Sequence, residues 1–230
     1  MKEVNLIIAA MDEEVQALLD NLPNYEVKTI DDNTAYEFKI RDENFILVKG
    51  KIGKVYTSIF LSRLALILKI KRVFNIGTSG GVNKGLKIND VIIATKVGYH
   101  DVDVTFFNYE IGQIPGDPRY YECDNEFDNE FVESKIIDPK YSIKRGIILS
   151  GDSFVTRENI NSKNINVEEC LACEMESASV GQTCSQLKIP FVVIRSISDL
   201  TFEQIDLDRN SDDVVSSSTN SALVLLELIK

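Results

Sequence analysis

Basic residues, cysteine and histidine are scarce in this 230-residue chain. The 25 Lys and Arg residues are outnumbered by 36 Asp and Glu residues, which gives a formal net charge of −11. A chain of this charge repels the phosphate backbone of a nucleic acid, so we expect no nucleic-acid partner. Four cysteines are too few for a disulfide scaffold, and the first residues contain no cationic leader. We therefore expect a protein of the reducing cytoplasm.

Long hydrophobic runs are also missing. The apolar run at Leu6–Met11 stops at Asp12, and no other run approaches the roughly 20 apolar residues that a membrane-spanning helix needs. We thus expect no membrane partner. Hydrophobic residues still make up 44% of the chain, which is enough for one sizeable core. Because no repeat, low-complexity tract or linker divides the sequence, we predict a single domain over residues 1–230.

The spacing of hydrophobic residues predicts strands that alternate with helices. Short apolar or alternating runs predict strands at residues 4–10, 25–30, 35–40, 44–49, 72–76, 90–98, 142–149 and 191–197. Apolar residues at helical spacing predict helices after an N-cap at Asp12 and at residues 55–70, 176–187 and 211–230. Three of the strands, between residues 25 and 49, form an antiparallel meander. The order of elements favours an α/β fold, a three-layer αβα sandwich with a mixed, largely parallel central sheet.

Polar clusters follow the predicted strands, where open α/β sheets place their ligands. The acids Asp12-Glu13-Glu14 follow the first strand, although acids also stabilise the start of a helix without any further role. Residues 77–81, Gly-Thr-Ser-Gly-Gly, predict a turn through which a backbone can approach a sugar or phosphate. This turn has neither the Gly-Lys-Ser/Thr of a P-loop nor the spacing of a dinucleotide fingerprint, so it is a weak signal alone.

A third cluster pairs acids with one arginine. Glu174 and Glu176 lie at the head of a predicted helix, and Arg195 and Asp199 lie at the end of a buried strand. Buried charges need partners, because an unpaired buried carboxylate or guanidinium is costly. An ion pair that ties strand to helix and a functional site both fit this pattern.

Histidine and cysteine offer little for metal chemistry. His100 is the only histidine and follows a predicted strand, where we favour a structural hydrogen-bonding role over a catalytic one. Cys170 and Cys173 have CxxC spacing, but the chain has neither a second such pair nor a pair of histidines. We expect no metal and no other cofactor.

Seven segments carry motifs that occur in one fixed order: Ala9–Val15, Gly50–Val55, Asn75–Gly81, Tyr99–Thr105, Ser150–Phe154, Cys173–Glu176 and Ile194–Asp199. Together they resemble the bacterial 5′-methylthioadenosine/S-adenosylhomocysteine nucleosidases, collinearly from near residue 4 to residue 200. One such motif would be weak evidence, whereas seven in order are specific. The resemblance implies the nucleoside phosphorylase fold, a homodimer, and hydrolysis of a nucleoside to adenine and a 5-thioribose product.

The same resemblance implies two carboxylates on opposite sides of the ribose. Asp199 matches the general acid that protonates N7 of adenine, and Ser198 can hold this carboxyl in place. Glu14 matches the residue that activates water, with Thr78 and Arg195 expected to orient that water. Glycoside hydrolases also place two carboxylates around the bond that they cleave.

Further matched residues imply the substrate-binding walls. Glu176 corresponds to the acceptor of the ribose hydroxyls, with Met175 and Glu174 beside it. Phe154 would stack on adenine while the backbone of Val155 reads its edge. Apolar residues would complete the base and thioalkyl pockets: Met11 and Ile52, then Val104, Phe107 and Pro115 from the neighbouring subunit, with Tyr109 close by.

Departures from the family pattern and two alternatives remain open. Thr78 replaces a serine seen in some relatives but keeps the hydroxyl. Near Arg209, relatives often carry an aromatic residue that covers the 5′ pocket, so this lid is either more polar here or formed by Phe202 instead. The preferred 5′ substituent is therefore undetermined. A purine nucleoside phosphorylase would use phosphate, which needs cationic neighbours, and the acids at 12–14 with Asn75 argue for water instead. A catalytically silent nucleoside-binding protein is the other alternative, against which the three retained carboxylates argue.

Overall fold

The computed structural model describes residues 2–125, 142–163, 165–202 and 211–230. The strands are β1 (Glu3–Ala9), β2 (Glu26–Ile30), β3 (Asn33–Ile40), β4 (Glu43–Lys49), β5 (Lys69–Gly81), β6 (Val91–Tyr99), β7 (Tyr120–Glu122), β8 (Ile143–Ser150), β9 (Cys170–Glu174) and β10 (Phe191–Leu200). The helices are α1 (Asp12–Leu19), α2 (Lys54–Ile67), α4 (Ser177–Leu187) and α5 (Ser211–Ile229), with 3₁₀ turns η1 (Thr105–Phe107) and η2 (Ile160–Ser162). Each predicted strand and helix is present, with shifted ends.

One mixed sheet forms the centre of the molecule. Its strand order is β10-β6-β8-β9-β5-β1-β4-β3-β2, with β7 paired to β6 and β10 paired to β5 as well. Strands β4, β1, β5 and β10 run parallel to their neighbours in this series, and β2, β3 and β4 form the predicted antiparallel meander. Because β10 pairs with both β5 and β6, five strands close into a ring in the order β5, β9, β8, β6 and β10.

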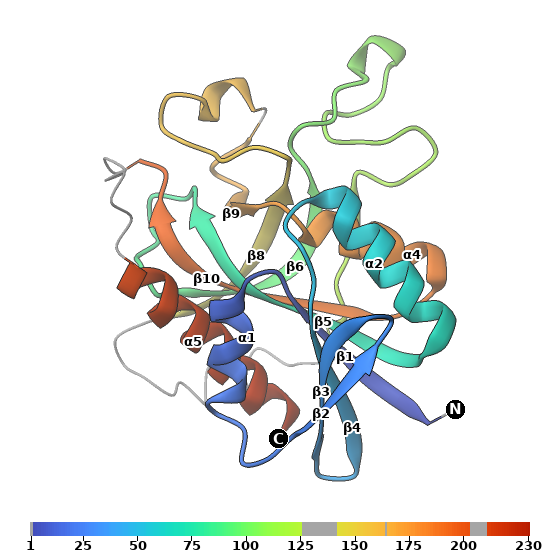
Figure 1. Cartoon of the computed structure of the whole chain (residues 1–230). Coiled ribbons are helices and arrows are strands. Elements are labelled where there is room, and N and C mark those ends of the chain that lie inside the picture. The colour runs from blue at the N-terminus through green and yellow to red at the C-terminus, as the bar shows by residue number, and fades with distance from the viewer. Residues whose placement is uncertain (1, 126–141, 164, 203–210) are drawn as a thin grey trace.

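Helices cover both faces of the sheet (Figure 1). Helices α1 and α5 lie together on one face, and α2 and α4 lie together on the other. Successive residues of β1 point to opposite faces, so Leu6 packs with the α2 and α4 side while Ile7 packs with the α1 and α5 side. Each face thus has its own buried hydrophobic cluster. The predicted three-layer αβα sandwich is confirmed.

Several local predictions were wrong. Residues 77–81 are not a turn, because pairing with β10 on one side and β9 on the other extends β5 as far as Gly81. Strands β7 and β9 were not predicted at all. Helix α1 has Met11 rather than Asp12 as its N-cap. These differences arise where tertiary pairing overrides local sequence preference.

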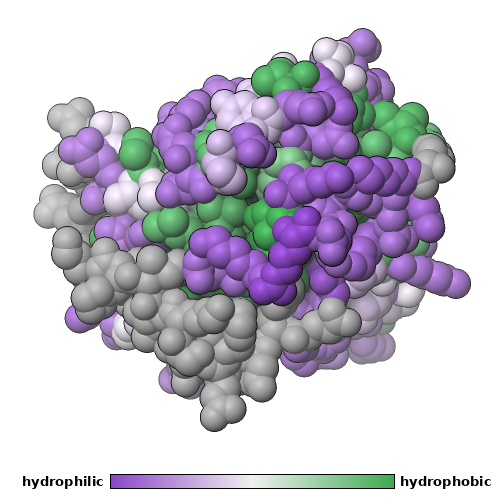
Figure 2. Space-filling model, turned by 90° about the horizontal axis from the view of Figure 1, so that it is seen from below, coloured by the Kyte–Doolittle hydropathy of each residue, from purple (hydrophilic) through white to green (hydrophobic). Residues whose placement is uncertain are grey.

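The surface is largely hydrophilic on the face shown in Figure 2, where a hydrophobic patch near the middle is bordered by hydrophilic residues. None of the helices in the part of the chain that the structure describes is both long and apolar enough to cross a membrane. Large exposed hydrophobic side chains recur on α2 and η1: Val55, Tyr56, Ile59, Leu66, Ile67, Phe106 and Phe107. Helix α2 therefore presents an apolar face to its surroundings.

Candidate active site

A cavity of about 230 Å³ opens where β1, β5, β9 and β10 end. Most of the predicted site residues line it: Met11, Glu14, Ile52, Thr78, Phe154, Val155, Glu174, Met175, Glu176, Arg195 and Asp199. Ser198 precedes Asp199 in the sequence, and its hydroxyl donates to Asp199 Oδ1 at 3.0 Å. The sequence motifs thus converge on one site although they are spread over nearly 190 positions of the chain.

Other residues of the predicted set lie elsewhere. Val104, Phe107 and Pro115, predicted to come from a neighbouring subunit with Tyr109 close by, do not line the cavity of their own chain. Five lining residues had no predicted role: Ala10, Ser79, Gly80, Ser153 and Cys173. Each of these five lies within two positions of a predicted residue, so closeness to the motifs was the signal that could have found them. Arg209, with its neighbours Asp208 and Asn210, lies outside the described residues.

Glu14 is held firmly at the start of α1. Its Oε2 accepts hydrogen bonds from the backbone N–H groups of Ala10 (2.8 Å) and Met11 (3.1 Å), and its Oε1 accepts one from the N–H of Thr78 (2.9 Å). The Met11 contact is part of the capping box that begins the helix, so a structural role and a place in the cavity coexist. Burial raises the pKa of Glu14, while Arg195 and the three N–H groups oppose this rise.

Arg195 is the charged centre of the site. It is 1% exposed, and its Nη2 donates to Asn75 Oδ1 at 2.6 Å and to Glu174 Oε2 at 2.7 Å. Glu176 Oε2 lies 3.6 Å from the same nitrogen. Burial would lower the pKa of Arg195, but the carboxylates of Glu174, Glu176 and Glu14 raise it overall. The ion pair expected between strand and helix is present, and it joins β10 to the start of α4.

The two neighbouring glutamates have different surroundings. Glu174 Oε2 accepts hydrogen bonds from the backbone N–H groups of Glu176 (3.0 Å) and Ser177 (2.9 Å) and from Arg195, so this carboxylate serves the start of α4. Glu176 Oε1 accepts a hydrogen bond from the N–H of Gly53 at 2.9 Å. Burial raises the pKa of Glu176 to about 8, with Glu174 adding to the rise and Arg195 opposing it. Glu176 therefore keeps acceptor capacity for a ligand.

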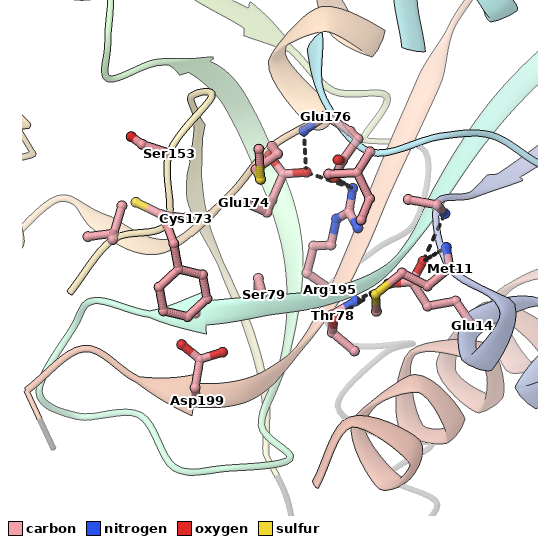
Figure 3. A pocket seen from close by; sticks show the side chains of 16 residues that line it. Met11, Glu14, Thr78, Ser79, Ser153, Cys173, Glu174, Glu176, Arg195 and Asp199 are labelled. Atoms are coloured by element: carbon pink, nitrogen blue, oxygen red, sulfur yellow. Dashed lines mark hydrogen bonds and ion pairs between the residues drawn. The ribbon is translucent and has the colours of Figure 1, made fainter. Parts of the chain in front are cut away.

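Glu14 and Asp199 lie on opposite sides of the cavity, as Figure 3 shows, with Glu174, Glu176 and Arg195 between them in this view. The carboxyl group of Asp199, on β10, lies against Gly80 of β5, since a Cβ added to Gly80 would lie 2.9 Å from Asp199 Oδ2. A ligand in the cavity is thus flanked by a carboxyl group at each end. This is an arrangement that can donate a proton on one side and accept one on the other.

His100 and the cysteines form no additional centre in the described residues. His100 is 1% exposed at the end of β6, and neither ring nitrogen has a hydrogen-bond partner among the described residues. The ring packs on Gly151, where an added Cβ would lie 2.3 Å from His100 Cε1. The preference for a structural over a catalytic role of His100 stays a prediction. Burial lowers the pKa of His100, which Asp101 partly offsets. All four cysteines are free and buried.

Fold and cavity agree with the comparisons to known proteins. The sequence model of the Phosphorylase superfamily matches residues 6–230, which makes this chain a member of that superfamily. A curated 5′-methylthioadenosine/S-adenosylhomocysteine nucleosidase of Bacillus anthracis is 35% identical over 227 residues, which cover 97% of this chain and 98% of the relative. The chain belongs to this family of nucleosidase enzymes, and the resemblance inferred from the seven segments is confirmed.

Solved structures give the same result. The nucleosidase of Streptococcus pneumoniae, bound to a transition-state inhibitor, superposes with a TM-score of 0.86 at 33% identity, covering 100% of this chain and 99% of that one. The nucleosidase of Colwellia psychrerythraea, bound to adenine, gives a TM-score of 0.88 at 30% identity, covering 99% and 94%. The fold of this chain is therefore shared over its whole length.

Proposed function

We propose that this enzyme hydrolyses the N-ribosyl bond of 5′-methylthioadenosine and of S-adenosylhomocysteine, releasing adenine and the 5-thioribose product. The observation that carries the proposal is the pair of carboxyl groups, Asp199 and Glu14, on opposite sides of one cavity. The names of the relatives and the adenine and inhibitor bound in their structures support the same substrate class.

In the proposed reaction, protonated Asp199 donates its proton to N7 of adenine. The C1′–N9 bond then breaks, and its electron pair leaves with a purine that carries no net charge. The Ser198 hydroxyl, 3.0 Å from Asp199 Oδ1, fixes the orientation of the carboxyl group. A positioned acid of this kind accelerates a reaction by about 10²–10⁴-fold.

Glu14 acts as the base on the other side of the ribose. A water molecule loses a proton to Glu14, and its oxygen bonds to C1′. The raised pKa of the buried carboxylate makes Glu14 a stronger base than an exposed glutamate. Thr78 and Arg195, which also line the cavity, orient the water.

Carboxylates around the sugar stabilise the positive charge that develops on the ribose ring. Glu14, Glu174 and Glu176 surround a single guanidinium, so acidic side chains outnumber the cation. Glu176 accepts hydrogen bonds from the ribose hydroxyls, and such contacts strengthen as the ring becomes positive. The remaining walls bind the purine and the thioalkyl group, with Phe154 stacking on adenine beside Val155, Met11, Ile52 and Met175.

The charge of the cavity favours water over phosphate as the nucleophile. Arg195 is the one cationic side chain among the described residues that line the cavity, and Glu174 and Asn75 already accept its hydrogen bonds. Glu14, the proposed base, also lines the cavity and would repel a phosphate dianion. A phosphorylase reaction is therefore disfavoured.

A second copy of the chain completes the thioalkyl pocket in this proposal. Val104, Phe107, Tyr109 and Pro115 lie away from their own cavity, and Phe107 is 67% exposed. The apolar face of α2 supplies a surface for a homodimer. Light scattering on the purified protein tests this, since a mass near twice 25.9 kDa is expected and a monomer would contradict it.

The four free cysteines fit a cytoplasmic enzyme.

Adenine release from 5′-methylthioadenosine in phosphate-free buffer tests the proposed reaction. We expect activity in the parent and a fall of about 10²–10⁴-fold in kcat for Asp199→Asn. Asp12→Asn is the matched control, because the Asp12 side chain is 82% exposed and pairs with Lys49. Activity that appears only with added phosphate would establish a phosphorylase. Binding of the nucleoside without turnover in either buffer would establish a silent binding protein.

A further inference from the structure

Three segments of the chain, two of which carry residues that line the cavity, meet at one lysine. Lys54 is the first residue of α2, and its Nζ lies 2.6 Å from Asp101 Oδ2, just after β6. The same Nζ lies 3.5 Å from Asp152 Oδ2, in the loop after β8. The backbone N–H of Lys54 also donates to Asp152 Oδ1 at 3.3 Å. Side chain and backbone of one residue therefore hold both aspartates.

The two aspartates are joined to each other as well. The backbone N–H of Asp152 donates to Asp101 Oδ2 at 2.9 Å, so this oxygen receives a backbone N–H and an ammonium group together. The side chains of Lys54 and Asp101 are only 20% and 23% exposed, so solvent and salt screen this pair less than a surface pair. Burial raises the pKa of Asp101, but Lys54 and the Asp152 N–H lower it overall. We call these three residues the Lys54 cluster.

The joined segments carry different parts of the cavity. Directly before Lys54, Ile52 lines the wall, and the N–H of Gly53 holds Glu176 Oε1 at 2.9 Å. Two residues after Asp152, Phe154 forms another wall. Ile52 and Phe154 are 52% and 47% exposed, so deep packing does not fix either wall. The Lys54 cluster is the polar connection that spans the two.

We propose that Lys54 is a positioning residue that aligns the ribose-binding part of the cavity with its purine-binding part. The inference rests on the proposed function, since it takes Glu176 as the ribose acceptor and Phe154 as the purine platform. Lys54 does not line the cavity and acts through Gly53 on one side and Asp152 on the other. A nucleoside must fit both parts at once, so a small shift between them weakens its binding.

The test compares a whole nucleoside with adenine alone in Lys54→Met. We expect KM for 5′-methylthioadenosine to rise about tenfold, or about 1.4 kcal/mol, with kcat within about threefold of the parent. The calorimetric Kd for this nucleoside, measured with and without Lys54→Met in the Asp199→Asn background so that little is hydrolysed, should rise by the same factor. The Kd for adenine should change by less than about twofold, because adenine occupies only one of the two parts. Lys54→Arg keeps a cation within reach of both aspartates and should restore most of the affinity for the nucleoside.

Lys51→Met is the matched control, since Lys51 lies on the same loop with its ammonium 4.7 Å from the centre of the Tyr56 ring. It should leave the nucleoside and adenine values unchanged. Where Lys54→Met lowers the yield of folded protein, Asp152→Asn provides a second route, because the Asp152 side chain is 51% exposed. Equal losses for adenine and nucleoside, or no loss for the nucleoside, would overturn the proposal. A parent that binds the nucleoside but releases no adenine refutes the proposed reaction, while the binding comparison still decides the role of Lys54.

Discussion

Glu14 Oε1, on helix α1, accepts a hydrogen bond from the backbone N–H of Thr78, in strand β5, at 2.9 Å across 64 positions of the chain. The N–H groups of Ala10 and Met11 hold the other oxygen. Three fixed donors therefore orient a carboxylate that burial would otherwise drive toward the neutral form. The local fold around the ends of β1 and β5 prepares this base before any substrate arrives.

Glu14→Gln should lower kcat for adenine release by about 10²–10⁴-fold. Glutamine has one acceptor oxygen, so its amide N–H₂ must face backbone donors on one side, and it cannot accept the proton of the water. Steady-state kinetics in phosphate-free buffer measure this. Glu13→Gln, at the exposed neighbouring position, should keep the parent kcat. A Glu14→Gln variant with more than about a tenth of the parent kcat would show that another group serves as the base.

Arg195→Met should be severely destabilising. The substitution leaves Glu174 and Glu176 buried without the cation that pairs with them. Breaking a buried ion pair in this way lowers the free energy of unfolding by about 3–5 kcal/mol. Urea titration of the free energy of unfolding measures the loss. Arg63→Met is the control, because Arg63 pairs with Asp31 at the surface with its own side chain 56% exposed, and such pairs contribute less than about 1 kcal/mol. Similar losses in both variants would refute the central role of Arg195.

The sequence allowed the sandwich to be predicted, because β1 is a short apolar run and helices α1 and α5 carry apolar residues at helical spacing. Strand β9 could not be predicted in this way, since Cys-Leu-Ala-Cys-Glu has neither alternation nor β-branched residues. It becomes a strand because β8 and β5 pair with it. Residues 77–81 are a similar case. Their glycines favour a turn locally, and pairing with β10 overrides that preference.

The site residues were predictable from motifs, but their division of labour was not. Glu174 and Glu176 are two positions apart in one motif, and only the geometry shows that Glu174 serves the start of α4 while Glu176 accepts the N–H of Gly53. The Lys54 cluster was also beyond prediction, because its members are separated by 47 and 51 positions and follow no local pattern. Contacts of this kind depend on how distant strand ends meet.

Gly77→Ala should disable the site without changing any reacting group. A Cβ at Gly77 would lie 2.3 Å from Glu14 Oε1 and 2.5 Å from Arg195 Nη1, and φ of +151° is rarely adopted by other residues. Both neighbours are already fixed by hydrogen bonds, so one must leave its place. We expect kcat to fall at least about 100-fold, as when a catalytic group is displaced, with a loss of about 1–3 kcal/mol in unfolding free energy.

Gly50→Ala provides the control for this substitution. An added Cβ there meets its nearest atoms at 3.5–3.6 Å, which is ordinary contact, so activity and stability should stay close to the parent. Kinetics and urea titration on both variants make the comparison. Normal turnover in Gly77→Ala would mean that Glu14 or Arg195 can move without consequence.

The pH dependence of stability provides a test of the charge on Glu176. Its pKa in the folded protein is about 8, against an ordinary value of 4.5, with burial as the largest cause. Between these two values the folded state holds a proton that the unfolded state has lost, so stability falls as pH rises through the window. His100 contributes little above about pH 7, because unfolded histidine is mostly neutral there and the lowered pKa keeps the folded one neutral, and this contribution is the same in Glu176→Gln. Glu14, whose pKa is also raised, acts in the same direction as Glu176.

Between about pH 7 and about pH 8, the parent should therefore lose more unfolding free energy than Glu176→Gln, by up to about 1 kcal/mol. Urea titrations at the two pH values measure the difference, and the ionisation of unfolded cysteines near pH 8 is common to both proteins and cancels in the comparison. Glu13→Gln should behave like the parent, since that side chain is exposed in both states. Identical pH slopes for the parent and Glu176→Gln would mean that Glu176 is already ionised at pH 7.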